Sequence, residues 1–378
     1  MEANYQFIEI GSELEKIARS LEKGKIIAVD LEADSMYHLK EKVCLIQMAT
    51  KRNSILIDPL QIRNLSSLKP LFSNKNIKKI FHGADYDIRS LYRDFKIKVN
   101  NLFDTELACR FLGIKETGLE AVLKNFFGVS LNKKYQKKDW SIRPLLQEMI
   151  DYAARDVIYL VSLAEILEKE LDKKGRLSWV LEECDLLSKV RPVLSRGEPL
   201  FLKFRGAGNL DSQSLAVLEA LLQFRKKVGE KKDKPLFKII GNSELLKITT
   251  TRPVTLRSLK VKKILSERQI SIYGSALVEA INTAMKIPEK DLPVYPRKKA
   301  SVVTYRVKER MKALKKWRDK RAKELEIDPA LLFNKGLLKS IATHKPCDKK
   351  SIETIKGMKN WQKREFGREI IATLKDVL

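Results

Sequence analysis

The second half of the chain contains the same landmarks twice, about 93 residues apart. Phe224–Arg225 recurs as Trp317–Arg318, and Tyr273–Gly274 recurs as Phe366–Gly367. The apolar residues there do not alternate with polar ones, so strands are not indicated. Two copies are too few for a solenoid. We therefore predict two small helical domains, residues 209–290 and 303–378, joined by the Pro- and Lys-rich segment 291–299.

The first half has a different pattern, in which strand and helix signals alternate. Strands are indicated at 5–10, 25–31, 43–49, 55–58, 77–81 and 99–103. Helices are indicated at 12–24, 65–72, 84–93, 105–112, 119–127 and 144–169, the first opened by a capping box of Ser12 and Glu15. Consecutive strands followed by alternating elements predict a mixed sheet with helices packed on it, over residues 1–195. The predicted fold class is α/β plus all-α.

The charge is divided in the same way. The chain has 75 Lys and Arg against 48 Asp and Glu, a net charge of +27. Residues 1–190 carry 31 basic and 28 acidic residues, whereas residues 191–378 carry 44 and 20. Such an excess favours a polyanionic partner, nucleic acid or an anionic membrane surface, over a lysine-rich surface that serves only solubility. The basic clusters are 225–227 with 231–234, 260–263, 297–299 and 308–323.

Several classes of protein are disfavoured by composition. Four scattered cysteines and three histidines suit neither a disulfide framework nor a zinc site. The acidic start lacks the apolar stretch of a secretory signal, and no run of 18 apolar residues exists to span a membrane. No long basic amphipathic helix stands apart from the repeats to lie on a membrane. We expect a cytoplasmic protein with reduced thiols.

Two carboxylates interrupt an otherwise apolar strand in the segment IIAVDLEAD. Asp30 and Glu32, two residues apart, point to the same face of the sheet. In a partly buried strand two anions repel and are poorly solvated, and a divalent cation resolves both problems. The alternative is an exposed face at the end of a strand.

Two further segments carry aspartates. FHGADYDIRSL places Asp85 and Asp87 at the start of a helix that follows a strand, where α/β proteins form their sites. Helix capping is the alternative, and it suits Asp85. DYAARDVIYL places Tyr152 and Asp156 on one helix face at i and i+4, a spacing that also suits a simple surface hydrogen bond.

Together, VDLEAD, FHGADYDIRSL and YAARD resemble the three motifs of the DEDD exonucleases, in the same order. The tyrosine of the third motif is similar to that of the DEDDy subgroup. The intervening segments VCLIQMAT, LFDTELACRFLG and KKDWSIRPL resemble the ribonuclease D branch, and the second half resembles tandem HRDC domains. Each short motif is weak alone, but three in order with the tandem domains are specific. The resemblance implies an RNase H-like exonuclease domain before two HRDC-like domains.

The resemblance implies that Asp30, Glu32, Asp87 and Asp156 hold two Mg²⁺ or Mn²⁺ ions, with Asp87 preferred to Asp85. Oxygen ligands without histidine or thiolate suit these hard cations. It also implies that Tyr152 positions or helps to deprotonate the attacking water. Because a tyrosine has a pKa of about 10, we favour the orienting role.

Four residues are candidate substrate contacts, each with a structural alternative. Gln47 lies on the strand expected beside the catalytic one, and a structural polar contact is equally consistent. His82 ends a strand before Asp87, where a structural role is common. Lys137 and Trp140 lie in a segment of lysines and aromatics that suits a single strand, although Trp140 can instead anchor a solvated loop to the core.

The predicted function is a metal-dependent 3′–5′ exoribonuclease that releases nucleoside 5′-monophosphates. By resemblance, its RNA substrates are the precursors of transfer RNA and other small structured RNAs. A DNA exonuclease with the same chemistry is an alternative, since no residue here can be identified as a reader of the 2′-hydroxyl. A non-catalytic RNA-binding protein is the alternative of another class, which the presence of all four carboxylates disfavours. HRDC domains also serve as protein-contact modules, but the sequence identifies no protein partner.

Overall fold

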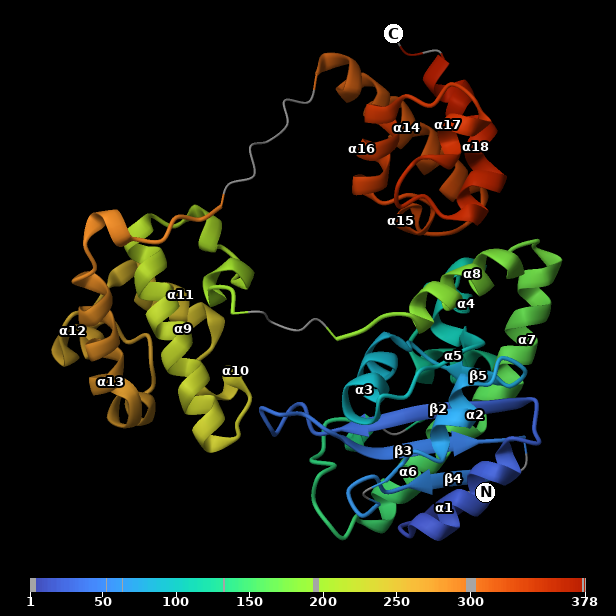
Figure 1. Ribbon diagram of the computed structural model, residues 1–378, viewed down its shortest axis with the longest axis horizontal. Helices are drawn as coiled ribbons and strands as arrows, with labels where there is room; N and C mark the ends of the chain where they lie inside the picture. Colours follow the sequence, from blue (N-terminus) through green and yellow to red (C-terminus); the bar gives the residue numbers. More distant parts are fainter. Residues whose placement is uncertain are drawn as a thin grey trace. The chain divides into compact units, whose positions relative to one another are not determined.

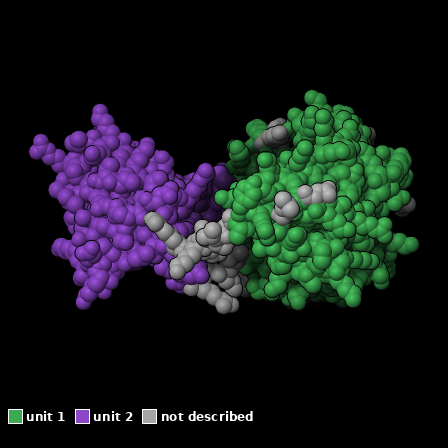
Figure 2. Space-filling view, turned by 90° about the horizontal axis from the view of Figure 1, so that it is seen from above, with its two compact units in different colours: residues 1–33, 42–192, 302–378 green, residues 34–41, 193–301 purple. Residues whose placement is uncertain are grey.

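The computed structural model describes residues 5–51, 53–62, 64–131, 133–192, 197–296, 304–375 and 377. The chain forms two compact units, coloured in Figure 2. Unit 1 comprises residues 1–33, 42–192 and 302–378, and unit 2 comprises residues 34–41 and 193–301. The predicted domain limits 195, 303 and 378, and the basic cluster 297–299, lie outside the described residues and stay predictions.

A six-stranded mixed sheet forms the centre of the first part of unit 1 (Figure 1). Its strands, in the order β1-β4-β3-β2-β5-β6, are β1 (Tyr5–Ile8), β4 (Ser54–Ile57), β3 (Val43–Ala49), β2 (Ile26–Ala33), β5 (Lys78–Phe81) and β6 (Leu102–Asp104). Strand β3 is antiparallel to both its neighbours, and the other pairs are parallel. The mixed α/β class predicted from the sequence is confirmed.

Helices connect and cover these strands. They are α1 (Gly11–Leu21), α2 (Leu68–Ser73), α3 (Asp85–Phe95), α4 (Thr105–Leu112), α5 (Leu119–Phe127), α6 (Gln147–Ile158), α7 (Leu160–Lys173) and α8 (Leu177–Ser188), with a 3₁₀ turn at Lys133–Tyr135. Helix α6 packs across β2, β3 and β4. Its apolar residues Met149, Ala153 and Ala154 form a small core with Leu45 and Leu56 on the face of the sheet below.

Two local predictions were wrong. The helix expected over 144–169 is two helices, α6 and α7, separated at Tyr159. The capping box of Ser12 and Glu15 does not form, because α1 begins one residue earlier, at Gly11, after the extended residue Ile10. Ser12 therefore lies inside the first turn rather than at the N-cap.

The predicted all-helical character of the second half is also confirmed for its described residues. The first repeat, in unit 2, consists of α9 (Ser212–Lys232), α10 (Leu236–Ile239), α11 (Asn242–Thr251), α12 (Leu256–Val261) and α13 (Glu267–Met285), with 3₁₀ turns at Leu200–Lys203, Ala207–Asn209 and Glu289–Asp291. The second repeat, in unit 1, consists of α14 (Tyr305–Glu324), α15 (Pro329–Leu332), α16 (Lys335–His344), α17 (Lys349–Glu353) and α18 (Asn360–Lys375).

The two repeats share buried contacts as well as element order. Arg225 donates to the carbonyl of Ile240, and Arg318 donates to the carbonyl of Phe333. Similarly, the amide of Gln269 donates to the carbonyl of Ile239, and the amide of Gln362 donates to the carbonyl of Leu332. Because side chains at equivalent positions bond equivalent carbonyls, the two repeats have the same internal design.

Within unit 1, the second repeat packs against α8 of the α/β part. The rings of Trp179 and Trp361 stack with centroids 4.8 Å apart. Lys359 forms an ion pair with Glu183, and Glu182 accepts hydrogen bonds from the backbone amides at the start of α18. Arg176 joins the two parts by donating to the carbonyls of Phe111 and Leu325. Aromatic stacking and charged hydrogen bonds thus hold this interface together.

Among the described residues no helix is both long enough and apolar enough to cross a membrane. Cys44, Cys109 and Cys184 are buried and Cys347 is exposed, all as free thiols.

Candidate active site

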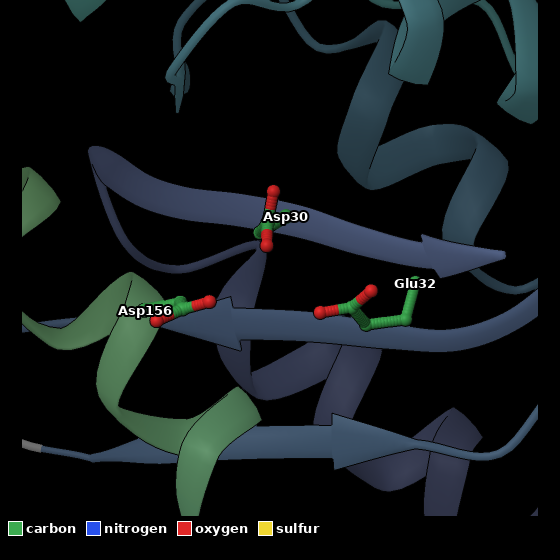
Figure 3. A group of neighbouring side chains, drawn as sticks. All are labelled: Asp30, Glu32 and Asp156. Carbon is green, nitrogen blue, oxygen red and sulfur yellow. The ribbon is translucent and has the colours of Figure 1, made fainter. Parts of the chain in front are cut away.

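Three of the predicted metal ligands lie close together where β2 of the sheet faces α6 (Figure 3). Asp30 and Glu32 project from β2, and Asp156 projects from α6. One carboxylate oxygen from each lies within 4.8 Å of the others. A β-bulge follows Glu32, where the pairing of β2 with β3 shifts register. Bulges of this kind commonly re-aim side chains beside functional sites.

Burial and mutual repulsion make this cluster unfavourable in its ionised form. Burial raises the pKa of Asp30 to about 6 and the pKa of Asp156 to about 8. Burial and then the charges of Asp30, Asp156 and Asp87 raise the pKa of Glu32 well above its usual range. Raised pKa values of several carboxyls at one place indicate a site that a cation would stabilise.

Asp87 lies beside this cluster but outside the three-residue group. It occupies the first turn of α3 and is 7% exposed. Burial and then the charges of Asp30 and Asp104 raise the pKa of Asp87 well above its usual range. Asp85 instead pairs with Arg89 at 2.8 Å on the exposed side of the same helix.

The aspartate that caps helices here is Asp104 rather than Asp85. The N-cap of α3 is Ala84, so the capping role considered as the alternative for Asp85 is not observed. Asp104 accepts hydrogen bonds from the amides of Glu106 and Leu107 at the start of α4. It also accepts from the amides of Gly83 and Ala84, and so ties the start of α3 to β6.

Tyr152 contacts the cluster from the same helix as Asp156. Burial, followed by the charges of Asp156 and Glu32, raises the pKa of the Tyr152 phenol far above its usual range. The ring packs between Tyr135 and Trp140, each with its centroid 6.1 Å away. A phenol that keeps its proton can donate a hydrogen bond and orient a water molecule, but it is not a base near neutral pH.

A cleft of about 500 Å³ opens beside the carboxylates. Asp30, Glu32, Tyr152 and Asp156 form one wall, and the remaining lining includes His82, Glu106, Thr117, Gly118, Leu119, Glu120, Leu131 and Gln136. Within this lining, the hydroxyl of Thr117 donates a hydrogen bond to the carboxylate of Glu106. Glu106 and Thr117 were not predicted as site residues. Glu106 lies in the segment LFDTELACRFLG and Thr117 in none of the motifs, and only the fold brings both to the cleft.

The four predicted substrate contacts lie in different environments. His82 lines the cleft, and its Nδ1 is 2.9 Å from the hydroxyl of Thr105. Burial lowers the pKa of His82, which favours the neutral ring. Lys137 is exposed, next to the cleft residue Gln136. Gln47 is fully buried and Trp140 is 1% exposed, so neither presents a surface to a nucleotide in this structure.

The donor set suits a divalent cation of the Mg²⁺ or Mn²⁺ type. The group contributes carboxylate oxygens alone, the ligands that these hard ions prefer. Among the residues that the structure describes, Asp156 Oδ1 is buried without a hydrogen-bond partner. A buried acceptor with no donor needs another partner, and a bound cation or its hydration water would supply one.

The arrangement of mixed sheet, carboxylate cluster and adjacent tyrosine defines the class of DEDDy-type exonucleases. Comparison with known proteins agrees. The family model described as 3′–5′ exonuclease matches residues 5–172, and the HRDC domain model matches residues 214–281 and 307–374. The chain belongs to the 3′–5′ exonuclease family and carries tandem HRDC domains.

Three similar proteins, one curated sequence and two solved structures, serve as examples. The exosome complex exonuclease RRP6 of Saccharomyces cerevisiae is 37% identical over 195 residues, which are 51% of this chain and 27% of that protein. The catalytic core of RRP6 from Trypanosoma brucei is 30% identical, with a TM-score of 0.65, over 75% of this chain and 80% of that one. Escherichia coli RNase D shares the fold over 99% of both chains, with a TM-score of 0.74 and 23% identity.

The chain spans less than half of the length of the first curated relatives it matches, between 19% and 47%. The relatives' full-length activities and assemblies therefore bear on this chain only as proposals.

Proposed function

We propose that the protein is a metal-dependent 3′–5′ exoribonuclease that releases nucleoside 5′-monophosphates from the 3′ ends of RNA. The observation that supports this proposal most strongly is the convergence of Asp30, Glu32 and Asp156 within 4.8 Å, with Asp87 and Tyr152 beside them. Transfer RNA precursors and other small structured RNAs are the substrates we propose first. The similar RNase D is described as an exoribonuclease involved in structured RNA processing.

The chain's own groups divide the work. Asp30, Glu32, Asp87 and Asp156 would hold two Mg²⁺ or Mn²⁺ ions, whose charge would lower the pKa of a bound water and offset the negative charge on the leaving 3′-oxygen. Tyr152 keeps its proton and orients the attacking water through its hydroxyl. The adjacent cleft, with His82 and Thr117 in its wall, receives the 3′-terminal nucleoside.

RNA is proposed as the substrate on the basis of relatives and charge together. The exonuclease RRP6 belongs to an exosome complex, as its name states, and RNase D is named as a ribonuclease. Residues 191–378 carry 44 basic against 20 acidic residues, so both repeats offer phosphate contacts that do not depend on sequence.

A degradation assay tests this proposal. We expect 5′-labelled single-stranded RNA with Mg²⁺ to give a ladder of shortened products, and EDTA to abolish it. A matched DNA strand, run in parallel, should be degraded more slowly. Equal or faster degradation of DNA would identify a DNA exonuclease, and no ladder on either strand would contradict the proposal.

A further inference from the structure

Gln47 is a polar residue in the middle of a strand that is otherwise apolar and fully enclosed. All seven positions of β3 are buried, and the other six side chains are Val, Cys, Leu, Ile, Met and Ala. Gln47 itself is 0% exposed, and neither its Nε2 nor its Oε1 has a hydrogen-bond partner in the described part of the chain. A buried amide without partners is destabilising, so its presence calls for a function or a partner supplied on binding.

The strand register places Gln47 beside the carboxylate cluster. Gln47 lies directly opposite Asp30 on β2 and opposite Leu56 on β4. Residues that oppose one another in an antiparallel pair point to the same face, with Cβ atoms about 5 Å apart. The side chain of Gln47 therefore shares the face that carries Asp30.

Helix α6, which carries Asp156, covers that same face. Leu56 packs against Ala153 and Ala154 of α6. Ser54 is two residues before Leu56 and points to the same side, and its hydroxyl donates to the carbonyl of Ala154 at 3.4 Å. Gln47 thus lies on the sheet face that α6 covers, with Asp30 on the neighbouring strand and Asp156 on the covering helix.

Asp156 provides the complementary unpaired atom. Within the described ranges its Oδ1 is buried and has no hydrogen-bond partner, and Gln47 Nε2 is a buried donor without an acceptor. We propose that Gln47 is a positioning residue, whose Nε2 donates to Oδ1 of Asp156, directly or through one ordered water, when the metal site is filled. The bond would keep this carboxylate aimed at Asp30 and Glu32. The inference rests on the proposed function, because it takes Asp156 as a metal ligand.

The positioning role proposed for Gln47 differs from the substrate contact predicted from the sequence. A fully buried side chain cannot touch a nucleotide, but it can restrict the rotamer of a ligand. Partners of metal ligands, when substituted, typically change metal affinity by 10- to 100-fold. Gln47 would act on metal binding and only through it on catalysis.

The test uses Gln47→Met, which keeps the size of the side chain and removes the amide. Mn²⁺ binding to the full chain, measured by calorimetry without RNA, should weaken about 10- to 100-fold. The melting temperature in EDTA should stay the same or rise, because a buried unpaired amide is gone. With RNA, the Mg²⁺ concentration for half-maximal activity should rise, while kcat at saturating Mg²⁺ changes only a few-fold. Ser54→Ala is the matched control, as a buried polar residue under α6, and should bind Mn²⁺ within about twofold of wild type.

Each outcome decides between two hypotheses. If Gln47→Met binds Mn²⁺ like wild type, the positioning role is refuted and Gln47 is merely a core residue. If wild type itself binds no Mn²⁺, the proposed function fails instead. Should Gln47→Met not fold, a crystal structure of wild type with Mn²⁺ settles the matter. We expect Nε2 within about 3 Å of Asp156 Oδ1 or joined to it by one water, and an amide that faces elsewhere would overturn the inference.

Discussion

The close spacing of Asp30, Glu32 and Asp156 suits metal binding but is unfavourable when no metal is bound. Their oxygens are close enough to share a cation, and the same closeness makes the metal-free site repulsive. Natural proteins tolerate such local conflicts mainly at functional sites. Two consequences can be measured on single residues, one for the stability of the metal-free protein and one for catalysis.

The stability of the metal-free protein should fall as the pH rises from about 5 to 8. The folded-state pKa of Asp30 is raised to about 6 and that of Asp156 to about 8, above their values near 4 in an unfolded chain. In that window the folded protein binds more protons than the unfolded chain, so the free energy of unfolding decreases with pH. Melting temperatures in EDTA should show this decline, and Asp156→Asn should flatten it. A melting temperature that rises over this range in wild type would contradict the assignment.

Removal of the Tyr152 hydroxyl should slow catalysis without abolishing metal binding. We expect Tyr152→Phe to lower kcat by about 10²- to 10³-fold, the loss typical of a positioned hydrogen-bond donor in an active site. Its Mn²⁺ affinity should fall by no more than about 10- to 100-fold, because the phenol is a hydrogen-bond partner of Asp156 but is not itself a ligand. Single-turnover cleavage and calorimetry on the same preparation would measure both. Unchanged kcat would remove Tyr152 from the mechanism.

At the scale of single residues, the sequence predicts which side chains form the site better than it predicts how each one is buried or what surrounds it. The spacing of Asp30 and Glu32 places both on one face of a strand, and the i,i+4 spacing brings Tyr152 to Asp156, as observed. It cannot show that α6 covers β3, which is what buries Gln47 and turns it from a surface contact into a core residue. The same limit applies to Glu106 and Thr117, which reach the cleft only through the packing of α4 and α5.

The sequence predicts the exact bounds of elements with strong local signals. It does not predict the bounds of elements that depend on packing. Val43–Ala49 is apolar except for Gln47, and Thr105–Leu112 follows the capping residue Asp104 and is ended by Gly113, so both have the predicted bounds. The break between α6 and α7 at Tyr159 has no proline or glycine to announce it. Helix α6 lies across the sheet while α7 packs on β2 and β5, and this difference in packing is absent from local sequence.

The interface between α8 and the second repeat should depend on Trp179. This side chain is 5% exposed and stacks on Trp361. Trp179→Ala should lower the free energy of unfolding by about 3–5 kcal/mol, as large-to-small substitutions of buried aromatics do. Leu181→Ala on the same helix, where Leu181 is 41% exposed, should change it by less than about 0.5 kcal/mol. Urea denaturation measures both, and equal effects would show that the stacked pair does not hold the interface.

Across the whole chain the charge is divided between two tasks. Residues 1–190 are nearly balanced, with 31 basic and 28 acidic residues, and they form the carboxylate site. The repeats carry most of the excess, and α14 alone exposes Lys312, Lys315 and Lys316. We propose that cations are held by the carboxylate site of the balanced half and phosphates by the basic repeats.

This division predicts how RNA affinity depends on salt. Removal of one phosphate contact on a single strand should make the slope of log affinity against log salt less negative by about 0.7. The triple variant Lys312→Ala, Lys315→Ala and Lys316→Ala should therefore reduce the slope by up to about 2. The matched control replaces the exposed Lys16, Lys23 and Lys25 of the balanced half and should leave the slope unchanged. Fluorescence anisotropy over a KCl series measures both slopes, and equal slopes would contradict RNA binding by α14.

The most direct test of the central claim is the product released from RNA by wild type and by Asp30→Asn. With uniformly labelled RNA and Mg²⁺, wild type should release nucleoside 5′-monophosphates as the only small product, and EDTA should stop the release. Asp30→Asn should release them at least about 10³-fold more slowly while its RNA affinity stays within a few-fold of wild type. Release by Asp30→Asn at the wild-type rate, or release that continues in EDTA, would contradict a metal-dependent active site at this cluster.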